Sequence, residues 1–340
     1  MWQFIGRRIL ILIPTFFGIT FLTFSLVRLI PGDVVEVMMG ERGVDPAMHA
    51  AAIHRLGLDK PFLMQYIDYV NKIFHGDLGE SFVTRISVLD EFMQLFPATL
   101  EIMSLSIILV IIIGIVAGTT AAVKRGTWVD YSVVGLVLIC ASVPAFVWAL
   151  LLIMVFSGFL HLLPVSGAMN VLFDIPNQTG FSLIDAWLAE YANPILYQGA
   201  FWDACRHIVL PVTTLTLLLI SSTTRMTRTS MLETLNEPYI RTAQAKGMPY
   251  RRVIFVHALR NSLIPVITVI GLEVAVLMGG ALLTETIFAW PGVGKWMMDA
   301  LSRRDYPIIQ SGTLILATLT ILVNFIVDIL YGIANPRISR

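Results

Sequence analysis

The chain has 340 residues, of which 56% are hydrophobic and 14% are charged, and its formal net charge is zero. Soluble domains carry about 25% charged residues, so this composition excludes an ordinary soluble protein and indicates a membrane protein. The chain holds two cysteines, Cys140 and Cys205, which make neither a disulfide framework nor a metal-binding pattern. No nucleic-acid partner is expected.

The first predicted element is a membrane span over 9–30. Arg7 and Arg8 precede an apolar run from Ile9 to Val27. This run is longer than the apolar core of a signal peptide, which has about 7–15 residues, and no small-residue cleavage motif follows it. We therefore expect an uncleaved helix that begins in the cytoplasm.

Residues 31–98 are predicted to form a region outside the membrane. Within this region, 46–56 has the pattern of a capped helix and 62–74 that of an amphipathic helix. The apolar side of the second helix is expected to hold Phe62, Tyr66, Ile67, Val70 and Phe74. Most connections have about 4–6 residues, so this region is too long and too patterned to be a simple connector.

Five further apolar runs are long enough to cross a hydrocarbon core, which takes about 20 residues. These spans are predicted at 99–123, 131–160, 207–228, 262–286 and 311–333. The expected fold is an all-α polytopic membrane protein with six transmembrane helices. We divide it into an N-terminal helix, 1–30, an external loop region, 31–95, and a transmembrane domain, 96–335, with a cytoplasmic loop at 229–261.

The distribution of basic residues predicts the orientation of the spans. If the N-terminus lies inside, the cytoplasmic segments hold thirteen Lys and Arg residues but only three Asp and Glu residues. These segments are 1–8, 124–130, 225–261 and 334–340. The external segments are acidic overall, and Lys and Arg favour the cytoplasmic side in short loops. Both termini are therefore expected in the cytoplasm.

Motifs for catalysis or cofactor binding are absent from the sequence. The stretch GVGK at 292–295 suggests a phosphate-binding loop, but Ala289 stands where that motif has Gly and Trp296 where it has Ser or Thr. A tight turn is the favoured interpretation. The six histidines form no zinc-binding pattern. We expect no catalytic residue, cofactor or metal, and hence a protein that moves a substrate rather than converting it.

Two acids, Glu273 and Asp328, fall within predicted spans. An acid at membrane depth costs about 2.5–3.5 kcal/mol on insertion scales, so each is a candidate functional residue. One alternative is that it faces water along a permeation path; the other is that it only hydrogen-bonds a neighbouring helix. The fifth span also contains Gly279 and Gly280, which allow close packing or bending, and we predict that it lines a pore with Glu273 pointing inward.

A basic segment, 239–265, separates the fourth and fifth spans and contains no acid. Its small residues are expected to give a short helix a nearly bare surface, on which another protein can approach closely. The positive charge would orient an acidic partner. The alternative is contact with anionic lipid headgroups, but a simple basic tether does not need small residues. The basic and small residues are Arg241, Thr242, Ala243, Ala245, Lys246, Gly247, Arg251, Arg252 and Arg260.

The stretch RTAQAKG at 241–247 resembles the EAA loop of ABC-importer permeases, whose pattern is E-A-A-x-x-x-G. Ala243 and Gly247 match this pattern, whereas Arg241 and Thr242 replace its Glu and its first Ala. These departures resemble the peptide-importer subgroup. The resemblance to the dipeptide-type B permease extends over the whole chain: GDLGES at 76–81, SVPAF at 142–146, LLPVSG at 162–167, TETIFAWPGVGKW at 284–296, RRDYPIIQ at 303–310 and NPRI at 335–338.

The resemblance implies a type I ABC-importer permease fold in the bacterial inner membrane. It implies half of the pore of an ATP-driven importer of dipeptides or short peptides, with nickel, glutathione or longer oligopeptides as alternative cargo. Apart from the resemblance, two other classes stay open: a secondary transporter, which the lack of a clear ion relay disfavours, and a membrane-embedded enzyme, for which Glu273 and Asp328 are the only candidate groups at membrane depth. The implied partners are a second, homologous permease, two ABC ATPase subunits, an extracytoplasmic solute-binding protein and membrane lipid.

The residues expected to carry these roles form three sets. ATPase coupling is assigned to Arg241, Thr242, Ala243, Ala245, Lys246 and Gly247; the pore and gate to Glu273, Gly279, Gly280 and Asp328; and contact with the binding protein to Gly76, Asp77, Leu78, Gly79, Glu80 and Ser81.

Overall fold

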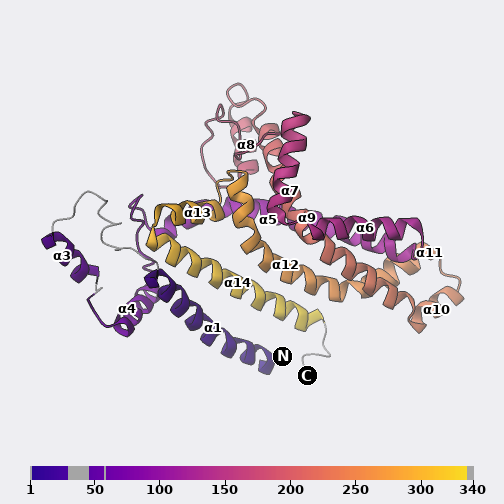
Figure 1. The fold of residues 1–340 in the computed structure, drawn as a ribbon. Helices are drawn as coiled ribbons and strands as arrows, with labels where there is room; N and C mark the ends of the chain where they lie inside the picture. Colours follow the sequence, from indigo (N-terminus) through magenta and orange to yellow (C-terminus); the bar gives the residue numbers. More distant parts are fainter. Residues whose placement is uncertain (1, 30–45, 57–58, 335–340) are drawn as a thin grey trace. The chain divides into compact units, whose positions relative to one another are not determined.

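The computed structural model describes residues 2–29, 46–56 and 59–334 (Figure 1). Over these residues the chain is helical, and its one β-type contact is an isolated bridge between Glu80 and Ser87. The predicted all-α class is therefore confirmed. The NPRI motif at 335–338 lies outside the described residues.

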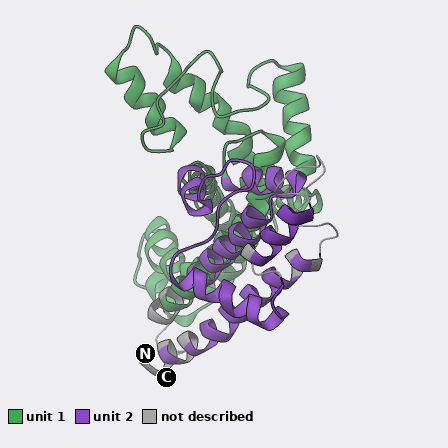
Figure 2. Ribbon diagram, turned by 90° about the vertical axis from the view of Figure 1, so that its left-hand side faces the viewer, with its two compact units in different colours: residues 1, 97–292, 323–340 green, residues 2–96, 293–322 purple. Residues whose placement is uncertain are grey.

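The contacts divide the chain into two compact units (Figure 2). Unit 1 comprises 97–292 and 323–340 with Met1, and unit 2 comprises 2–96 and 293–322. This grouping follows contacts rather than membrane topology, so the predicted division at residue 95 stays a prediction. Each unit is described separately below.

Unit 2 contains the N-terminal helix and most of the predicted external region. Its helices are α1 (Trp2–Leu29), α3 (Pro46–Leu56), α4 (Phe62–Phe74) and α13 (Val293–Arg303), together with residues 88–96 of α5 (Val88–Val123) and residues 306–322 of α14 (Tyr306–Ala334). The helices predicted at 46–56 and 62–74 are confirmed. The rings of Phe24 and Tyr69 stack between α1 and α4 at 5.5 Å, but Ile67 and Phe74 are exposed, so the predicted apolar side of α4 is only partly covered.

Unit 1 contains the longest helices and the short elements that connect them. They are residues 97–123 of α5, α6 (Trp128–Ser142), α7 (Ala145–Leu152), the π-helix η1 (Ile153–Phe159), α8 (Ser182–Ala192), α9 (Ala200–Leu235), α10 (Pro238–Ala245), α11 (Tyr250–Arg252), the π-helix η2 (Val253–Ala258), α12 (Leu259–Ile287) and residues 323–334 of α14.

Four helical stretches are long and apolar enough to cross a membrane. These stretches are Val88–Val123, Ala200–Leu235, Tyr250–Ile287 and Tyr306–Ile329. The first three contain the spans predicted at 99–123, 207–228 and 262–286, and the fourth contains most of the span predicted at 311–333. In α1, the apolar helix Leu10–Ser25 is shorter than a full span. The expectation of six transmembrane helices therefore stays a prediction.

The span predicted over 131–160 is not a straight helix. Helix α6 and the stretch Ala145–Phe159 meet at an angle of 102°. The break lies at Val143, which is extended with φ −107° and ψ 127°. The ring of Pro144 clashes with a helical conformation of the residue before it, and this explains why α6 ends here.

The core of unit 1 lies where α5, α9 and α12 meet. Ile102, Leu215, Leu277 and Trp290 are fully buried in one apolar cluster. Close packing of α5 on α9 depends on a small residue, because a Cβ at Gly118 would collide with Thr227 and the α9 backbone. Helices α8 and α10 lie toward opposite ends of unit 1 (Figure 1), as expected if one is external and the other cytoplasmic.

Candidate functional site

The predicted docking helix exists as α10, which begins with Pro238 in its first turn. Proline suits this position because its missing N–H would have no helical partner. Arg241, Thr242 and Ala245 are exposed, as predicted for the bare basic surface. Ala243 is not part of that surface, because it is only 8% exposed.

Ala243 and Ile240 form the inner side of α10. They pack in one cluster with apolar residues from the end of α5, from α9 and from η2. The prediction that Ala243 lies on the bare surface is therefore wrong. The sequence shows that the segment has small residues but not where they point, since their direction depends on which side of a two-turn helix meets the cluster.

Gly247 lies beyond the end of α10, and the expectation that it is a bare position within the helix is also wrong. Its φ is +73°, its N–H donates to the carbonyl of Gln244 at 2.9 Å, and the N–H of Met248 donates to the carbonyl of Ala243 at 3.3 Å. This arrangement resembles the Schellman motif, in which glycine adopts the left-handed conformation without a Cβ penalty. Gly247 therefore terminates α10.

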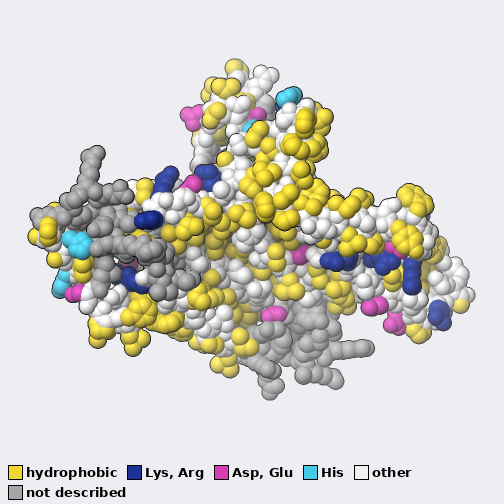
Figure 3. Space-filling view, in the orientation of Figure 1, with side chains coloured by type: hydrophobic (Ala, Val, Ile, Leu, Met, Phe, Trp, Pro, Cys, Tyr) yellow, Lys and Arg dark blue, Asp and Glu magenta, His cyan; other side chains and the backbone are white. Residues whose placement is uncertain are grey.

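The surface around α10 is basic. Lys246, Arg251, Arg252 and Arg260 are exposed, and Lys and Arg side chains gather along this end of unit 1 in Figure 3. A side chain added at Gly247 would meet no atom within 4 Å. The α10 surface is thus open and positively charged, which suits an acidic protein partner.

Helix α10 is tied to the start of α12 by hydrogen bonds that the sequence did not predict. The side-chain amide of Asn261 donates to the Tyr239 hydroxyl at 2.7 Å, and that hydroxyl donates to the carbonyl of His257 at 3.3 Å. In the next turn, the Ser230 hydroxyl of α9 donates to the carbonyl of Ser262 at 2.9 Å. These bonds provide a path by which a displacement of α10 would reach the first turn of α12.

Glu273 of α12 is 5% exposed and is hydrogen-bonded to α9. The Thr223 hydroxyl donates to it at 2.7 Å, and the Ser222 hydroxyl donates to its other oxygen. Of the two alternatives for this carboxylate, unit 1 shows the hydrogen bond to a neighbouring helix. Both of these hydrogen bonds join α12 to α9. The other predicted intramembrane acid, Asp328, is half-buried on α14.

The two predicted gate glycines of α12 differ in their surroundings. A Cβ at Gly280 would lie 3.2 Å from Leu218 of α9, whereas a Cβ at Gly279 would meet nothing within 4 Å. Gly280 therefore supports close packing, and Gly279 lies on an exposed face. Their assignment to a gate stays a prediction.

Two buried acids, Glu101 and Glu285, were missed by sequence analysis. Glu101 is 4% exposed and accepts the backbone N–H groups of Ser182 at 2.9 Å and Leu183 at 2.8 Å, so it caps the first turn of α8. Glu285 is fully buried and accepts the Thr99 hydroxyl at 2.7 Å. Both lie close to the ends of predicted spans, where an acid is easily taken for the polar flank.

A tight turn follows α12 and ends at Gly292, the first residue of the GVGK stretch, whereas the other three residues of the stretch begin α13. The N–H of Gly292 donates to the carbonyl of Trp290 at 2.8 Å, which closes a tight turn. The Glu285 carboxylate lies against Gly292 so closely that no Cβ fits there. Trp290 is fully buried and donates its indole N–H to the carbonyl of Ala98 at 2.9 Å. The glycine is required by packing rather than by phosphate binding.

The GDLGES stretch of unit 2 packs against the RRDYPIIQ stretch. The Ser81 hydroxyl donates to Asp305 at 2.6 Å, and the Ser311 hydroxyl donates to the carbonyl of Leu78 at 2.6 Å. Ser81 is fully buried, so a direct contact with a binding protein is excluded for this side chain in unit 2 as described. The other five residues of the stretch are exposed or half-buried.

A cavity of about 270 Å³ adjoins this contact within unit 2. Its lining includes Glu91, Trp296, Arg303 and Asp305. The Trp296 indole N–H donates to Glu91 at 2.7 Å, and Asp305 accepts the Ser81 hydroxyl. These two acids are thus occupied by hydrogen bonds from within the chain.

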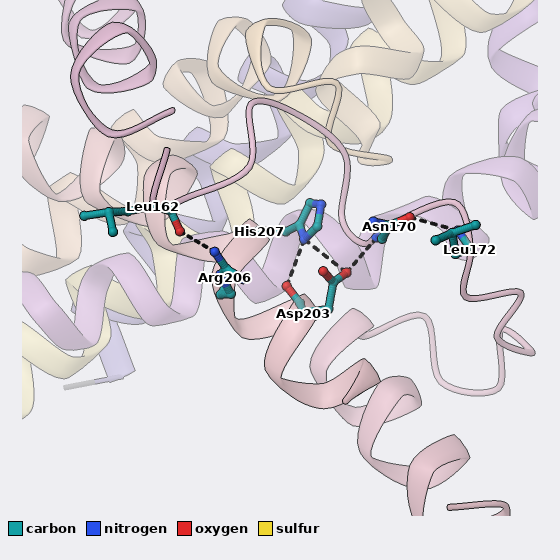
Figure 4. Close-up of polar contacts among 6 residues, drawn as sticks. All are labelled: Leu162, Asn170, Leu172, Asp203, Arg206 and His207. Carbon is teal, nitrogen blue, oxygen red and sulfur yellow. Dashed lines mark hydrogen bonds and ion pairs between the residues drawn. The ribbon is translucent and has the colours of Figure 1, made fainter. Parts of the chain in front are cut away.

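The predicted outer end of α9 is held by a polar cluster (Figure 4). Asp203 accepts the N–H of Asn170 at 2.7 Å and lies 3.3 Å from Nδ1 of His207. Arg206 donates to the carbonyl of Leu162 at 2.6 Å. These contacts fasten the loop that follows η1 to the first turns of α9.

An ion pair holds the other end of α9. The guanidinium of Arg228 donates to both oxygens of Asp130, at 2.7 and 2.8 Å, and the N–H of Gly126 donates to the same carboxylate at 3.0 Å. Bidentate pairs of this kind fix orientation as well as adding energy. The short connection between α5 and α6 is thereby fastened to α9.

A set of long apolar helices with a short, exposed basic helix between two of them is typical of a membrane permease subunit. The chain belongs to the binding-protein-dependent transport system inner membrane components: the model of that family matches residues 110–340, and the model of its N-terminal part matches residues 1–105. The predicted resemblance to ABC-importer permeases and the predicted location, multi-pass in the inner membrane, are confirmed.

Several relatives are similar to this chain over essentially their whole length. The di/tripeptide transport system permease protein DppB of Pseudomonas aeruginosa (strain UCBPP-PA14) is 57% identical over 340 residues, covering 100% of this chain and 99% of the relative. The dipeptide transport system permease protein DppB of Escherichia coli (strain K12) is 51% identical over 345 residues, with the same coverage. The oligopeptide transport system permease protein AppB of Bacillus subtilis (strain 168) is 36% identical over 340 residues and is covered completely, as is this chain.

Proposed function

We propose that this chain forms half of the translocation pore of an ATP-driven importer of dipeptides or short peptides. The observation that carries the mechanism is α10: an exposed, basic helix that is fastened to the start of α12 by Tyr239 and Asn261. The cargo class is supported by identities of 57% and 51% to the relatives named for di/tripeptide and dipeptide transport.

The proposed partners complete the importer. A second, homologous permease supplies the other half of the pore, two ABC ATPases dock on the α10 surfaces, and a solute-binding protein delivers cargo from outside. In this chain, coupling is assigned to the exposed residues Arg241, Thr242, Ala245 and Lys246. Gly247 shapes the end of that surface, and Ala243 supports it from within.

A longer-peptide cargo is the second candidate. It is favoured by the 36% identity to the relative named for oligopeptide transport. Uptake of labelled dipeptides, tripeptides, pentapeptides and nickel in a strain lacking its own peptide importers separates these functions. We expect dipeptide uptake that requires ATPase activity; uptake of pentapeptides or nickel alone contradicts the proposed cargo.

Docking at α10 is tested by Ala245→Trp. This residue is exposed and helical, so an indole there leaves the fold intact but occupies the space that a docked ATPase needs. We expect the thermal unfolding midpoint to be unchanged, ATPase co-purification to be lost and uptake to fall at least about tenfold, which corresponds to about 1.4 kcal/mol. The matched control is Ala50→Trp on the exposed side of α3. Normal uptake by the Ala245 variant would remove α10 from the coupling mechanism.

A further inference from the structure

Three aromatic side chains at one end of unit 1 are largely exposed. Trp187 and Tyr191 of α8 are 54% and 80% exposed, and Trp202 of α9 is 70% exposed. All three line one open cavity of about 430 Å³. We call these three residues the outer aromatic patch. Large exposed apolar patches mark surfaces that contact a protein or a membrane.

The opposite side of α8 packs on α9. Ala186 and Ala189 of α8 are buried, and Ala186 shares an apolar cluster with Ala200 and Ala204 of α9. Small residues let two helices approach closely. Ile184 is 45% exposed and lies three residues before Trp187, so the face that α8 turns outward is apolar along its length.

Of the two acids of α8, Asp185 is buried, whereas Glu190 is half-buried and lines the same cavity as the outer aromatic patch. Asp185 is 6% exposed and accepts the N–H of Gly180 at 3.0 Å. Glu190 accepts the N–H of Gly199 at 3.1 Å. The helix contains no Lys or Arg. Both oxygens of Glu190 accept backbone N–H groups, from Gly199 and Phe201, so this carboxylate is held by hydrogen bonds from within the chain.

The level of the patch follows from the position of Trp202 on α9. Trp202 lies five residues before His207, where the apolar run of this span begins. At about 1.5 Å per residue, this places Trp202 about 7.5 Å outside the hydrocarbon core. The headgroup layer on each side of that core is about 5–7 Å thick. Trp202 therefore lies at the outer edge of the headgroup layer, and the other two aromatic residues line the same cavity.

We propose that the outward face of α8, with the outer aromatic patch, lies in the headgroup layer of the outer leaflet and binds phospholipid. Trp and Tyr favour this layer because their rings are apolar and carry one polar group. The patch is continuous with the membrane span of α9, which favours lipid over a water-exposed partner.

Lipid contact at α8 would hold one end of α9 still. Glu101 of α5 caps α8, and the Asp203–Asn170 and Arg206–Leu162 hydrogen bonds fasten the adjoining loop to α9 (Figure 4). The opposite end of α9 leads into α10. The membrane interface would thus provide a fixed reference against which α10 moves.

The test measures what surrounds α8 in the assembled importer. Spin labels are placed at 187 and at 191 in a chain carrying Cys140→Ser and Cys205→Ala, and the complete importer is placed in nanodiscs of phosphatidylethanolamine and phosphatidylglycerol. Collision with oxygen, which concentrates in lipid, is compared with collision with a water-soluble nickel chelate. The control label is at Gln178, which is exposed in the same external segment.

We expect the ratio of oxygen to nickel collisions at 187 and 191 to exceed that at 178 several-fold, with or without the binding protein. Ratios equal to that at 178 would mean that α8 faces water and would overturn the proposal. Low collision with both reagents would mean burial against a second permease. Shielding that appears only when the binding protein is added would identify a protein docking surface. Either of the last two results also overturns lipid binding.

Discussion

Gly247 illustrates how one backbone conformation limits the residues tolerated beside a docking surface. Its φ of +73° lies in the left-handed region, where residues with a Cβ are strained by about 1–2 kcal/mol, and where Asn is better tolerated than Ala or Val. The space around it is open, so the restriction comes from the backbone and not from packing.

We predict that stability falls from the parent protein through Gly247→Asn and Gly247→Ala to Gly247→Val, with the alanine variant destabilised by about 1 kcal/mol. The measurement is the denaturant midpoint of the purified protein in nanodiscs. Lys246→Ala is the control, since Lys246 has a negative φ of −77°. If the Gly247→Val variant proves as stable as the parent, the glycine is retained for docking and not for the helix end.

At the scale of elements, α10, η2 and the first turn of α12 are joined by direct contacts. Two of these contacts involve the Tyr239 hydroxyl, which accepts from Asn261 and donates to the carbonyl of His257. Between α10 and α12 lies the π-helix η2, a rare form often found at functional sites. We infer that the three elements move together when an ATPase acts on α10.

We predict that Tyr239→Phe and Asn261→Ala each lower the number of peptides transported per ATP hydrolysed, while ATPase binding is retained. Both changes remove the same hydrogen bond, so the double variant should resemble the single variants. Proteoliposome transport and phosphate release give this ratio. Tyr250→Phe is the control on an exposed tyrosine of the same segment. Unchanged ratios in both single variants would show that the bond only stabilises the fold.

The exposed side of α12 gives a sharper pore prediction than Glu273 does. Leu272, Val276, Gly279 and Leu283 are exposed at spacings of four, three and four residues, which is one face of a helix. Glu273 faces α9 instead. We infer that this exposed face, rather than the carboxylate, borders the permeation path.

Single cysteines at 276, 279 and 283 should react with a water-soluble thiol reagent, and the rates should change when ATP is added. A cysteine at 277, whose native leucine is fully buried, should stay protected in both states. Thiol labelling followed by mass spectrometry measures the rates. Equal protection at all four positions would place the path elsewhere.

For the whole molecule, the proposed importer requires external contacts that one chain does not contain. In the GDLGES stretch, Asp77 and Glu80 are exposed and Ser81 is fully buried against Asp305. The two exposed residues carry carboxylates, while the buried serine holds the stretch in shape. The contact with the binding protein is therefore expected at Asp77 and Glu80 and not at Ser81.

Photo-crosslinkers at 77 and 80 should capture the binding protein during turnover, whereas one at 81 should not. Ser81→Ala should leave Asp305 with one hydrogen bond fewer and lower stability by about 1 kcal/mol. Crosslinked products are measured by immunoblotting. Capture from 81 alone, or from none of the three positions, would argue that the stretch is purely structural.

The sequence by itself determined the all-α membrane class, the positions of four long apolar helices, the helices at 46–56 and 62–74, and the existence of α10. These features depend on local composition and periodicity, which act over one or two helical turns. It also led to the correct permease family through the stretch around Gly247, although the glycine's role differed from the expected one. The motif was informative even where its physical interpretation was wrong.

Only the tertiary structure decided what each polar side chain contacts. Glu273 accepts two hydroxyl donors from α9, Glu101 caps a helix that begins 81 residues later in the chain, and Ala243 turns inward. The stretch expected to span at 131–160 is bent before Pro144, because the proline ring disfavours a helical conformation of the residue before it. The apolar composition of the stretch gave no sign of this bend. Membrane helices are apolar on all sides, so their sequence periodicity does not show which side faces a neighbour. That choice depends on small residues and hydrogen bonds between helices that are distant in the chain.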